Sequence, residues 1–189
     1  MKKNELFKAA ADIGFEYYGM LDVNTIELLP EVREMCKDGN CGAYGKNWAC
    51  PPGCGTLEEC QARVDKFEGG IIVQSMGKIK SSFDYRGMMD IMENHKKRFM
   101  EMMDYLVKQG KYKEILPLNA GACTVCEECT YPDEPCRFED KAFSSLESYG
   151  IYVSRLCRDN GIEYYYGPGT MSYTGAFLLR PRINSEKNK

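Results

Sequence analysis

Apolar residues recur along the chain with two spacings, which predict alternating helices and strands. Residues 5–13 place Leu6, Ala10 and Ile13 on one helical face, and Gly14 is a suitable C-cap. The next segment, FEYYGMLDV (15–23), predicts a strand. After it, PEVREMC (30–36) predicts a short helix that begins with a proline and ends at a cysteine.

The middle of the chain continues this alternation. Thr56 and Glu59 have the spacing of a capping box, which predicts a helix from residue 56, and GIIVQSMGKIK (70–80) predicts a strand. Residues 84–109 predict the longest helix. Its apolar stripe indicates core packing, because methionine fills irregular cores, and the stripe consists of Tyr85, Met88, Met92, His95, Phe99, Met102 and Leu106.

The C-terminal third predicts more strands than helices. KEILPLNAG (113–121) reads as a strand that leads into a cysteine-rich segment, and residues 144–150 and 151–161 predict short helices. Residues 162–166 and 171–181 predict a β-hairpin around a GPGT turn. We therefore expect an α/β or α+β fold, a mixed β-sheet layered with helices in a single domain over residues 1–182, and a frayed tail at 183–189.

Four cysteines in GACTVCEECTYPDEPCR form the clearest chemical motif. Cys123, Cys126, Cys129 and Cys136 have the spacing C-x2-C-x2-C-x6-C, which resembles the ligand run of a ferredoxin-type iron–sulfur cluster. The last gap is longer than in the common bacterial form, and the proline precedes the final cysteine. This favours one cluster with four ligands over two clusters that exchange ligands.

A second cysteine loop lies upstream. Cys36, Cys41, Cys50 and Cys54 have the spacing C-x4-C-x8-C-x3-C and are surrounded by glycines, which let backbone amides approach sulfur atoms. We expect a second [4Fe–4S] cluster here. Zinc is the alternative, chiefly at this loop, because zinc sites use closely spaced cysteine pairs.

Composition limits the other chemistries. The 189 residues include ten cysteines but a single histidine, His95, so sulfur is the expected ligand. No apolar run of 18 residues and no signal peptide is evident, so we expect a cytoplasmic protein without membrane insertion, in which five disulfides are disfavoured. A net charge of −3 gives no reason to expect nucleic-acid binding. Helical spacing favours core positions for Cys60 and Cys157, although a ligand role stays open for both, chiefly for Cys60 because it is close to Cys54.

The predicted function is one-electron transfer with a protein redox partner. The chain lacks the G-x-G-x-x-G, P-loop and C-x3-C-x2-C motifs, and clusters with four cysteine ligands transfer single electrons. The first loop (36–55) has a net charge of +1 and residues 123–140 a net charge of −5. We therefore expect the lower reduction potential at the second site, whose acidic loop suits a basic partner.

Two other functions fit the same residues. If one loop used only three cysteines, an open iron would act as a Lewis acid on a small molecule, and the protein would be an iron–sulfur enzyme. Alternatively, the thiols would bind zinc in a scaffold or metal-delivery protein. An assay for iron and acid-labile sulfide distinguishes these alternatives.

Two segments carry a resemblance to a known family, NCGAYGKNWACPPGC (40–54) and GACTVCEECTYPDEPCRFEDKAFSSLESYGI (121–151). The chain resembles prokaryotic cysteine-rich proteins described as predicted metal-binding proteins, a domain of unknown function. The resemblance implies a cysteine-bound metal, most readily an iron–sulfur cluster, in a cytosolic protein of organisms that often live without oxygen. It implies the same eight cysteines as ligands and implies no substrate.

Overall fold

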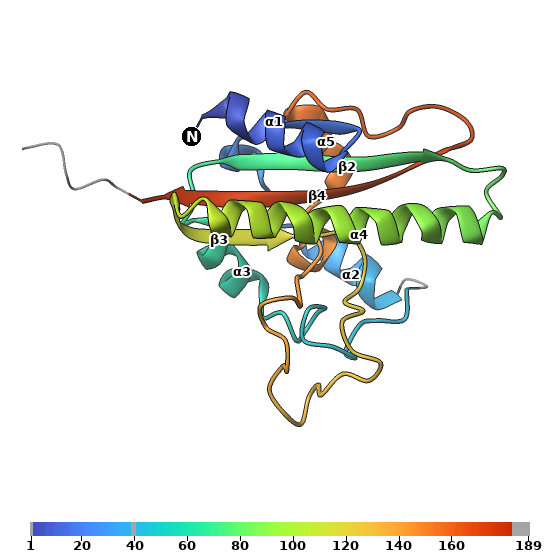
Figure 1. The fold of residues 1–189 in the computed structure, drawn as a ribbon. Helices are drawn as coiled ribbons and strands as arrows, with labels where there is room; N and C mark the ends of the chain where they lie inside the picture. The colour runs from blue at the N-terminus through green and yellow to red at the C-terminus, as the bar shows by residue number, and fades with distance from the viewer. Residues whose placement is uncertain (1, 39–40, 183–189) are drawn as a thin grey trace, which may run out of the picture.

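A four-stranded antiparallel sheet forms the centre of the computed structural model, which describes residues 2–38 and 41–182 (Figure 1). The strand order is β1-β2-β4-β3, and the strands are β1 (Tyr17–Leu21), β2 (Gly70–Lys78), β3 (Tyr112–Leu118) and β4 (Thr170–Pro181). The two longest strands, β2 and β4, pair in the middle, with Ile72 opposite Ala176. The predicted sheet layered with helices is confirmed, and every strand pair in it is antiparallel.

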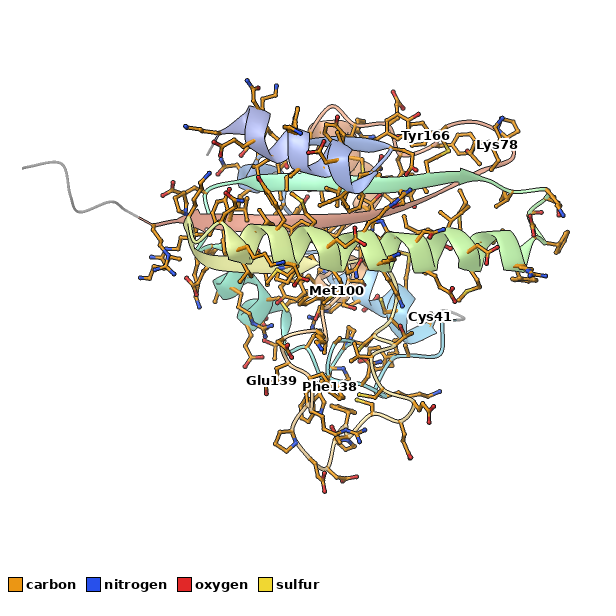
Figure 2. The ribbon with its side chains drawn as sticks, in the orientation of Figure 1. Cys41, Lys78, Met100, Phe138, Glu139 and Tyr166 are labelled. Atoms are coloured by element: carbon orange, nitrogen blue, oxygen red, sulfur yellow. The ribbon has the colours of Figure 1, made fainter. Side chains whose placement is uncertain are left out.

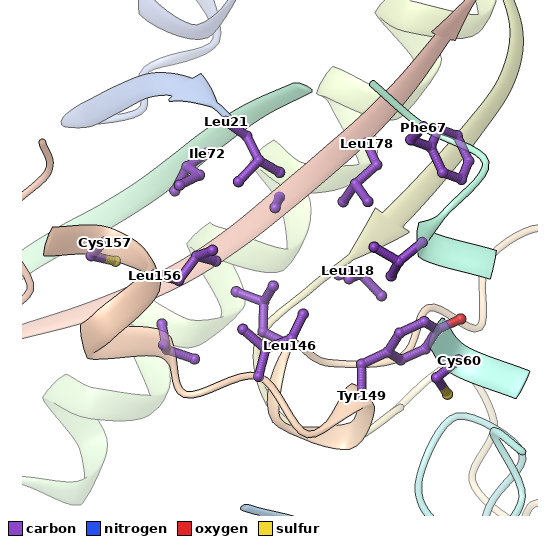
Figure 3. Close-up of a cluster of buried hydrophobic side chains, with 14 of the residues drawn as sticks. Leu21, Cys60, Phe67, Ile72, Leu118, Leu146, Tyr149, Leu156, Cys157 and Leu178 are labelled. Carbon is purple, nitrogen blue, oxygen red and sulfur yellow. The ribbon is translucent and has the colours of Figure 1, made fainter. Parts of the chain in front are cut away.

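Helices cover both faces of the sheet, because the central strands point apolar side chains to both sides. On one face α1 and α4 pack over the sheet, and the ring of Phe99 stacks on Phe177 with 4.1 Å between centroids. On the other face α3, η2 and α5 close a second core, which includes Cys60, Leu156 and Leu178 (Figure 3). The elements are α1 (Lys3–Ile13), η1 (Val23–Thr25), α2 (Pro30–Asp38), α3 (Leu57–Val64), α4 (Tyr85–Lys108), η2 (Glu147–Tyr149) and α5 (Val153–Asp159).

Local signals in the sequence account for several element ends. The capping box is confirmed, because the Thr56 hydroxyl accepts a hydrogen bond from the backbone N–H of Glu59 while the Glu59 carboxylate accepts one from the N–H of Thr56. Gly14 ends α1 with a φ of 99°. The stripe on α4 is buried at four positions but not at its first residue, since Tyr85 is 71% exposed.

The predicted hairpin between 162–166 and 171–181 is wrong. Of the two predicted strands only the second forms, as β4. It is hydrogen-bonded to β2 on one side and to β3 on the other, so β4 has no free edge for a further strand. Residues 162–166 instead form an irregular loop that contacts side chains of β2 and β4. There Tyr166 donates a hydrogen bond from its hydroxyl to Oε1 of Gln74 at 2.6 Å and stacks on Tyr17.

Both cysteine-rich loops extend from the same side of the sheet, below β3 and the middle of α4 in Figure 1. All ten cysteines are free thiols, so the structure contains no disulfide between them. Within the described ranges, no helix combines the length and the apolar composition that crossing a membrane requires. The predicted frayed tail, 183–189, lies outside the described residues.

Candidate metal centre

The four cysteines of the second run surround one small cavity. Cys123, Cys126, Cys129 and Cys136 are half-buried and all line it. Burial raises the pKa of the Cys123 thiol, and the other three thiols contribute to the same shift. The structure therefore brings together all four residues that the spacing predicts as ligands of the second site.

The ends of the second loop are held together at the edge of the sheet. Directly after β3, the backbone N–H of Asn119 donates to the carbonyl oxygen of Ser144 at 2.8 Å. The N–H of Leu146 donates to the carbonyl oxygen of Asn119 at 3.1 Å. The cysteines thus lie on a long loop whose two ends are adjacent, so a short strand and a buried turn fix its base.

The first loop packs directly against the second. The indole N–H of Trp48 donates to the carbonyl oxygen of Glu134 at 3.0 Å, and its ring meets Tyr131 edge-on with 4.9 Å between centroids. Gly53 permits this close approach, because a Cβ there would lie 3.0 Å from a ring carbon of Tyr131 in the second loop. Asn47, Trp48 and Ala49 also line the cavity of the second run. Residues 47–49, which lie between Cys41 and Cys50 of the first run, are therefore a shared wall of the two cysteine runs.

The cysteines of the first run lie in one region but with unequal exposure. Cys50 and Cys54 are buried, Cys36 is half-buried at the end of α2, and Cys41 is exposed. Burial raises the pKa of Cys36, and the neighbouring thiols Cys41 and Cys50 add to the shift. Cys50 is also a neighbour of Cys54. Cys36 and Cys54 thus both lie within the electrostatic range of Cys50.

Cys60 lies beside this set, although the sequence places it in the core. Its side chain is fully buried within the core cluster, as predicted (Figure 3). Its sulfur also lies 3.8 Å from the carbonyl oxygen of Cys54. A hydrogen bond with Cys54 and the positive charge of Arg33 lower the pKa of Cys60, against the opposing effect of burial. Cys60 therefore has both roles, core packing and contact with the first cysteine site.

Arg33 is a site residue that the sequence interpretation missed. Its Nη2 donates to the sulfur atoms of Cys60 at 3.0 Å and Cys54 at 3.5 Å. Its Nη1 and Nε donate to the carbonyl oxygens of Gly55 at 2.7 Å and Ser148 at 2.9 Å. The available signal was its position three residues before Cys36 on α2, because that spacing places the two side chains on one helix face.

Lys96 is a second missed residue, and it lies next to both runs. The sequence interpretation assigned it to a solvated cationic face, but it is half-buried. Its Nζ donates to the carbonyl oxygen of Ala122 at 3.0 Å and to Oγ1 of Thr124 at 2.9 Å. Burial lowers its pKa, while the thiols of Cys123 and Cys50, one from each run, oppose this shift. The ammonium group is thus a cation held against the start of the second run.

Two other candidates belong to the core, as predicted. Cys157 is fully buried on α5, and its sulfur accepts a hydrogen bond from Nε2 of Gln74 at 3.5 Å. His95 is fully buried and its Nδ1 lies 3.1 Å from the hydroxyl oxygen of Ser75. Among the described residues its Nε2 has no hydrogen-bond partner. Burial lowers the pKa of His95 to about 3, so the ring is neutral.

The donor set fits a cluster with thiolate ligands. Each run supplies four thiols, and thiolates are the usual protein ligands of [4Fe–4S] clusters. In residues 2–38 and 41–182, no three cysteine, histidine or carboxylate side chains converge on the position of a single metal ion. The second-run thiols instead line a shared cavity.

Comparison with known proteins agrees with a metal site. Searches of curated proteins and of solved structures found no match. Residues 19–179 match the family described as "Predicted metal-binding protein (DUF2284)", which spans both cysteine runs and all four strands except the ends of β1 and β4. Because this match covers most of the 189 residues, the chain belongs to the DUF2284 family of predicted metal-binding proteins.

Proposed function

We propose that this protein carries two [4Fe–4S] clusters, one on each cysteine run, and transfers single electrons to or from a protein redox partner. The observation that carries the proposal is the shared wall between the runs. Residues 47–49 of the first loop line the cavity that the four second-run cysteines surround. Two clusters held this way would be adjacent, which suits the passage of an electron from one to the other.

The proposed ligands are the eight cysteines of the two runs. When bound, the clusters would supply reversible one-electron redox chemistry. The set is Cys36, Cys41, Cys50 and Cys54 for the first site, and Cys123, Cys126, Cys129 and Cys136 for the second. Arg33 donates to the sulfur of Cys54 and would stabilise negative charge at the first site.

The two proposed sites differ in the net charge of the residues around them. The residues around the second run, 123–140, have a net charge of −5, and the first loop a net charge of +1. Negative charge disfavours the addition of an electron, so the second cluster would have the lower reduction potential. Lys96 contacts the second run and partly offsets this charge.

Metal and sulfide analysis of protein purified without oxygen tests the proposal. About eight irons and about eight acid-labile sulfides per chain are expected, with paramagnetic signals from two clusters after reduction. Zinc without sulfide contradicts the proposal and supports a zinc scaffold or a metal-delivery protein. Full cluster content together with turnover of a small molecule at one iron supports the alternative of an iron–sulfur enzyme.

A further inference from the structure

We propose that a groove next to both cysteine runs is the docking site for a redox protein with a basic surface. This inference rests on the proposed electron-transfer function and identifies where the partner binds. The groove has a volume of about 1100 Å³. Cys54 from the first run and Cys136 from the second both line it, so a partner seated there contacts the walls of both sites.

The groove lies between the long helix and the two loops. One side consists of α4 and β3, and the other of the segments around Trp48, Gly53 and residues 132–144. In Figure 2, Glu139 and Phe138 of the second loop lie below Met100 of α4. The groove is therefore lined by a thiol of each run.

The charges in the groove favour a basic partner. Six carboxylates line it against two cations, Arg63 and Lys141. The guanidinium group of Arg63 already forms hydrogen bonds within the chain, because it donates to the Tyr149 hydroxyl at 2.8 Å and to the carbonyl oxygen of Cys54 at 2.7 Å. All six carboxylates belong to exposed residues, and they are Glu59, Asp104, Asp133, Glu134, Glu139 and Asp140.

Five of these carboxylates are available to a partner, because the sixth, that of Glu59, accepts the capping-box hydrogen bond from the N–H of Thr56. In the described ranges, none of the six forms an ion pair with a cation of this chain, since the acidic members of the ion pairs there are other residues. Complementary charge accelerates the association of two proteins, and the effect weakens as salt is added. A basic protein would therefore be steered toward the groove.

The apolar part of the groove suits a protein rather than a small cation. Met100, Met103 and Val107 on α4 and Ile115 on β3 form a continuous apolar wall, and Val107 is 58% exposed. Protein interfaces combine an apolar centre with a polar rim. In this groove the carboxylates of the second loop provide such a rim beside the apolar wall.

The test uses oxidised cytochrome c, a basic one-electron protein, as the probe. On mixing with the reduced protein, one electron leaves a cluster and reduces ferric haem to ferrous haem, and no atoms are transferred. We expect the second-order rate constant to fall at least tenfold in the triple variant Glu134→Lys, Glu139→Lys, Asp140→Lys at low ionic strength. The wild-type rate constant is expected to fall as salt is added.

A matched triple variant separates groove charge from net charge. Glu68→Lys, Asp90→Lys and Glu163→Lys change the net charge equally at exposed positions outside the groove. The control is expected to keep at least half of the wild-type rate constant. Equal rate constants in the two triple variants, or a wild-type rate constant that does not depend on salt, would overturn the proposal.

Carbodiimide cross-linking of the wild-type protein to cytochrome c tests docking without relying on electron transfer. Cross-links from lysines of the probe to Glu134, Glu139 or Asp140 are expected. Cross-links found only elsewhere overturn the docking site. Metal and sulfide analysis of the same sample tests the clusters separately, so a failure of the proposed function is distinguishable from a failure of the docking proposal.

Discussion

The Nη2 atom of Arg33 lies 3.0 Å from the sulfur of Cys60, so a cation on α2 contacts a thiol on α3. The same guanidinium group donates to the sulfur of Cys54 and to the carbonyl oxygens of Gly55 and Ser148. One side chain thus connects three segments that are distant in the sequence. It holds the end of the first cysteine loop against the turn that precedes α5.

Replacing Arg33 is expected to destabilise the fold. Arg33→Gln removes most of these hydrogen bonds from a half-buried position, and we expect the free energy of unfolding to fall by about 2 kcal/mol. Urea denaturation followed by circular dichroism measures the change. Arg86→Gln, an exposed position on α4, serves as the matched control and is expected to change stability by less than about 0.5 kcal/mol. Equal losses in the two variants would contradict the role of Arg33.

Lys96 is expected to raise the reduction potential of the second cluster. Its ammonium group is bonded to Ala122 and Thr124, on either side of Cys123. Lys96→Met removes this positive charge, so adding an electron becomes less favourable and the potential shifts to a more negative value. A redox titration followed by electron paramagnetic resonance measures the shift. The neighbouring Lys97→Met, at an exposed position, is expected to produce a clearly smaller shift.

Cys136 is expected to be a ligand despite the long gap that precedes it. It lines the same cavity as Cys123, Cys126 and Cys129. Cys136→Ser is therefore expected to reduce iron and sulfide by about half, since the other site retains its cluster. Cys157→Ala, a buried cysteine on α5, is the control and should retain the full metal content. Full retention in Cys136→Ser would indicate an open iron and favour the enzyme alternative.

His95 is expected to make stability depend on pH. The folded protein keeps the ring neutral because burial lowers its pKa to about 3, whereas an unfolded histidine binds a proton below about pH 6.5. The unfolded state therefore binds more protons between these values, and stability falls as the pH decreases through this window. We expect a loss of about 2 kcal/mol between pH 7 and pH 5 from this residue.

The matched variant for this prediction is His95→Met, which places an apolar side chain without a titratable group on the buried stripe of α4. Chemical denaturation of both proteins at several pH values, with cluster content checked at each, gives the difference. The pH-dependent loss should be smaller in the variant by about the same 2 kcal/mol. Parallel curves for the two proteins would show that His95 does not carry the dependence.

Short-range features of the sequence predicted most elements and the ligand candidates. The capping box at Thr56 and the C-cap at Gly14 depend on neighbouring residues, and both are confirmed. The stripe on α4 predicted a core role for His95 because helical periodicity places it beside Phe99. The spacing of thiols in each run predicted a metal site, and the family match supports metal binding by this chain.

Contacts between distant segments decided the rest. Residues 162–166 have a strand-like composition, but both edges of β4 are occupied by β2 and β3, so they form no strand. The partners of Arg33 lie between 21 and 115 positions away from it in the sequence. Those of Lys96 lie 26 and 28 positions away, and no local pattern encodes contacts over such separations. The shared wall of the two cysteine runs arises in the same way. Chain packing, not ligand spacing, places the two cysteine loops side by side.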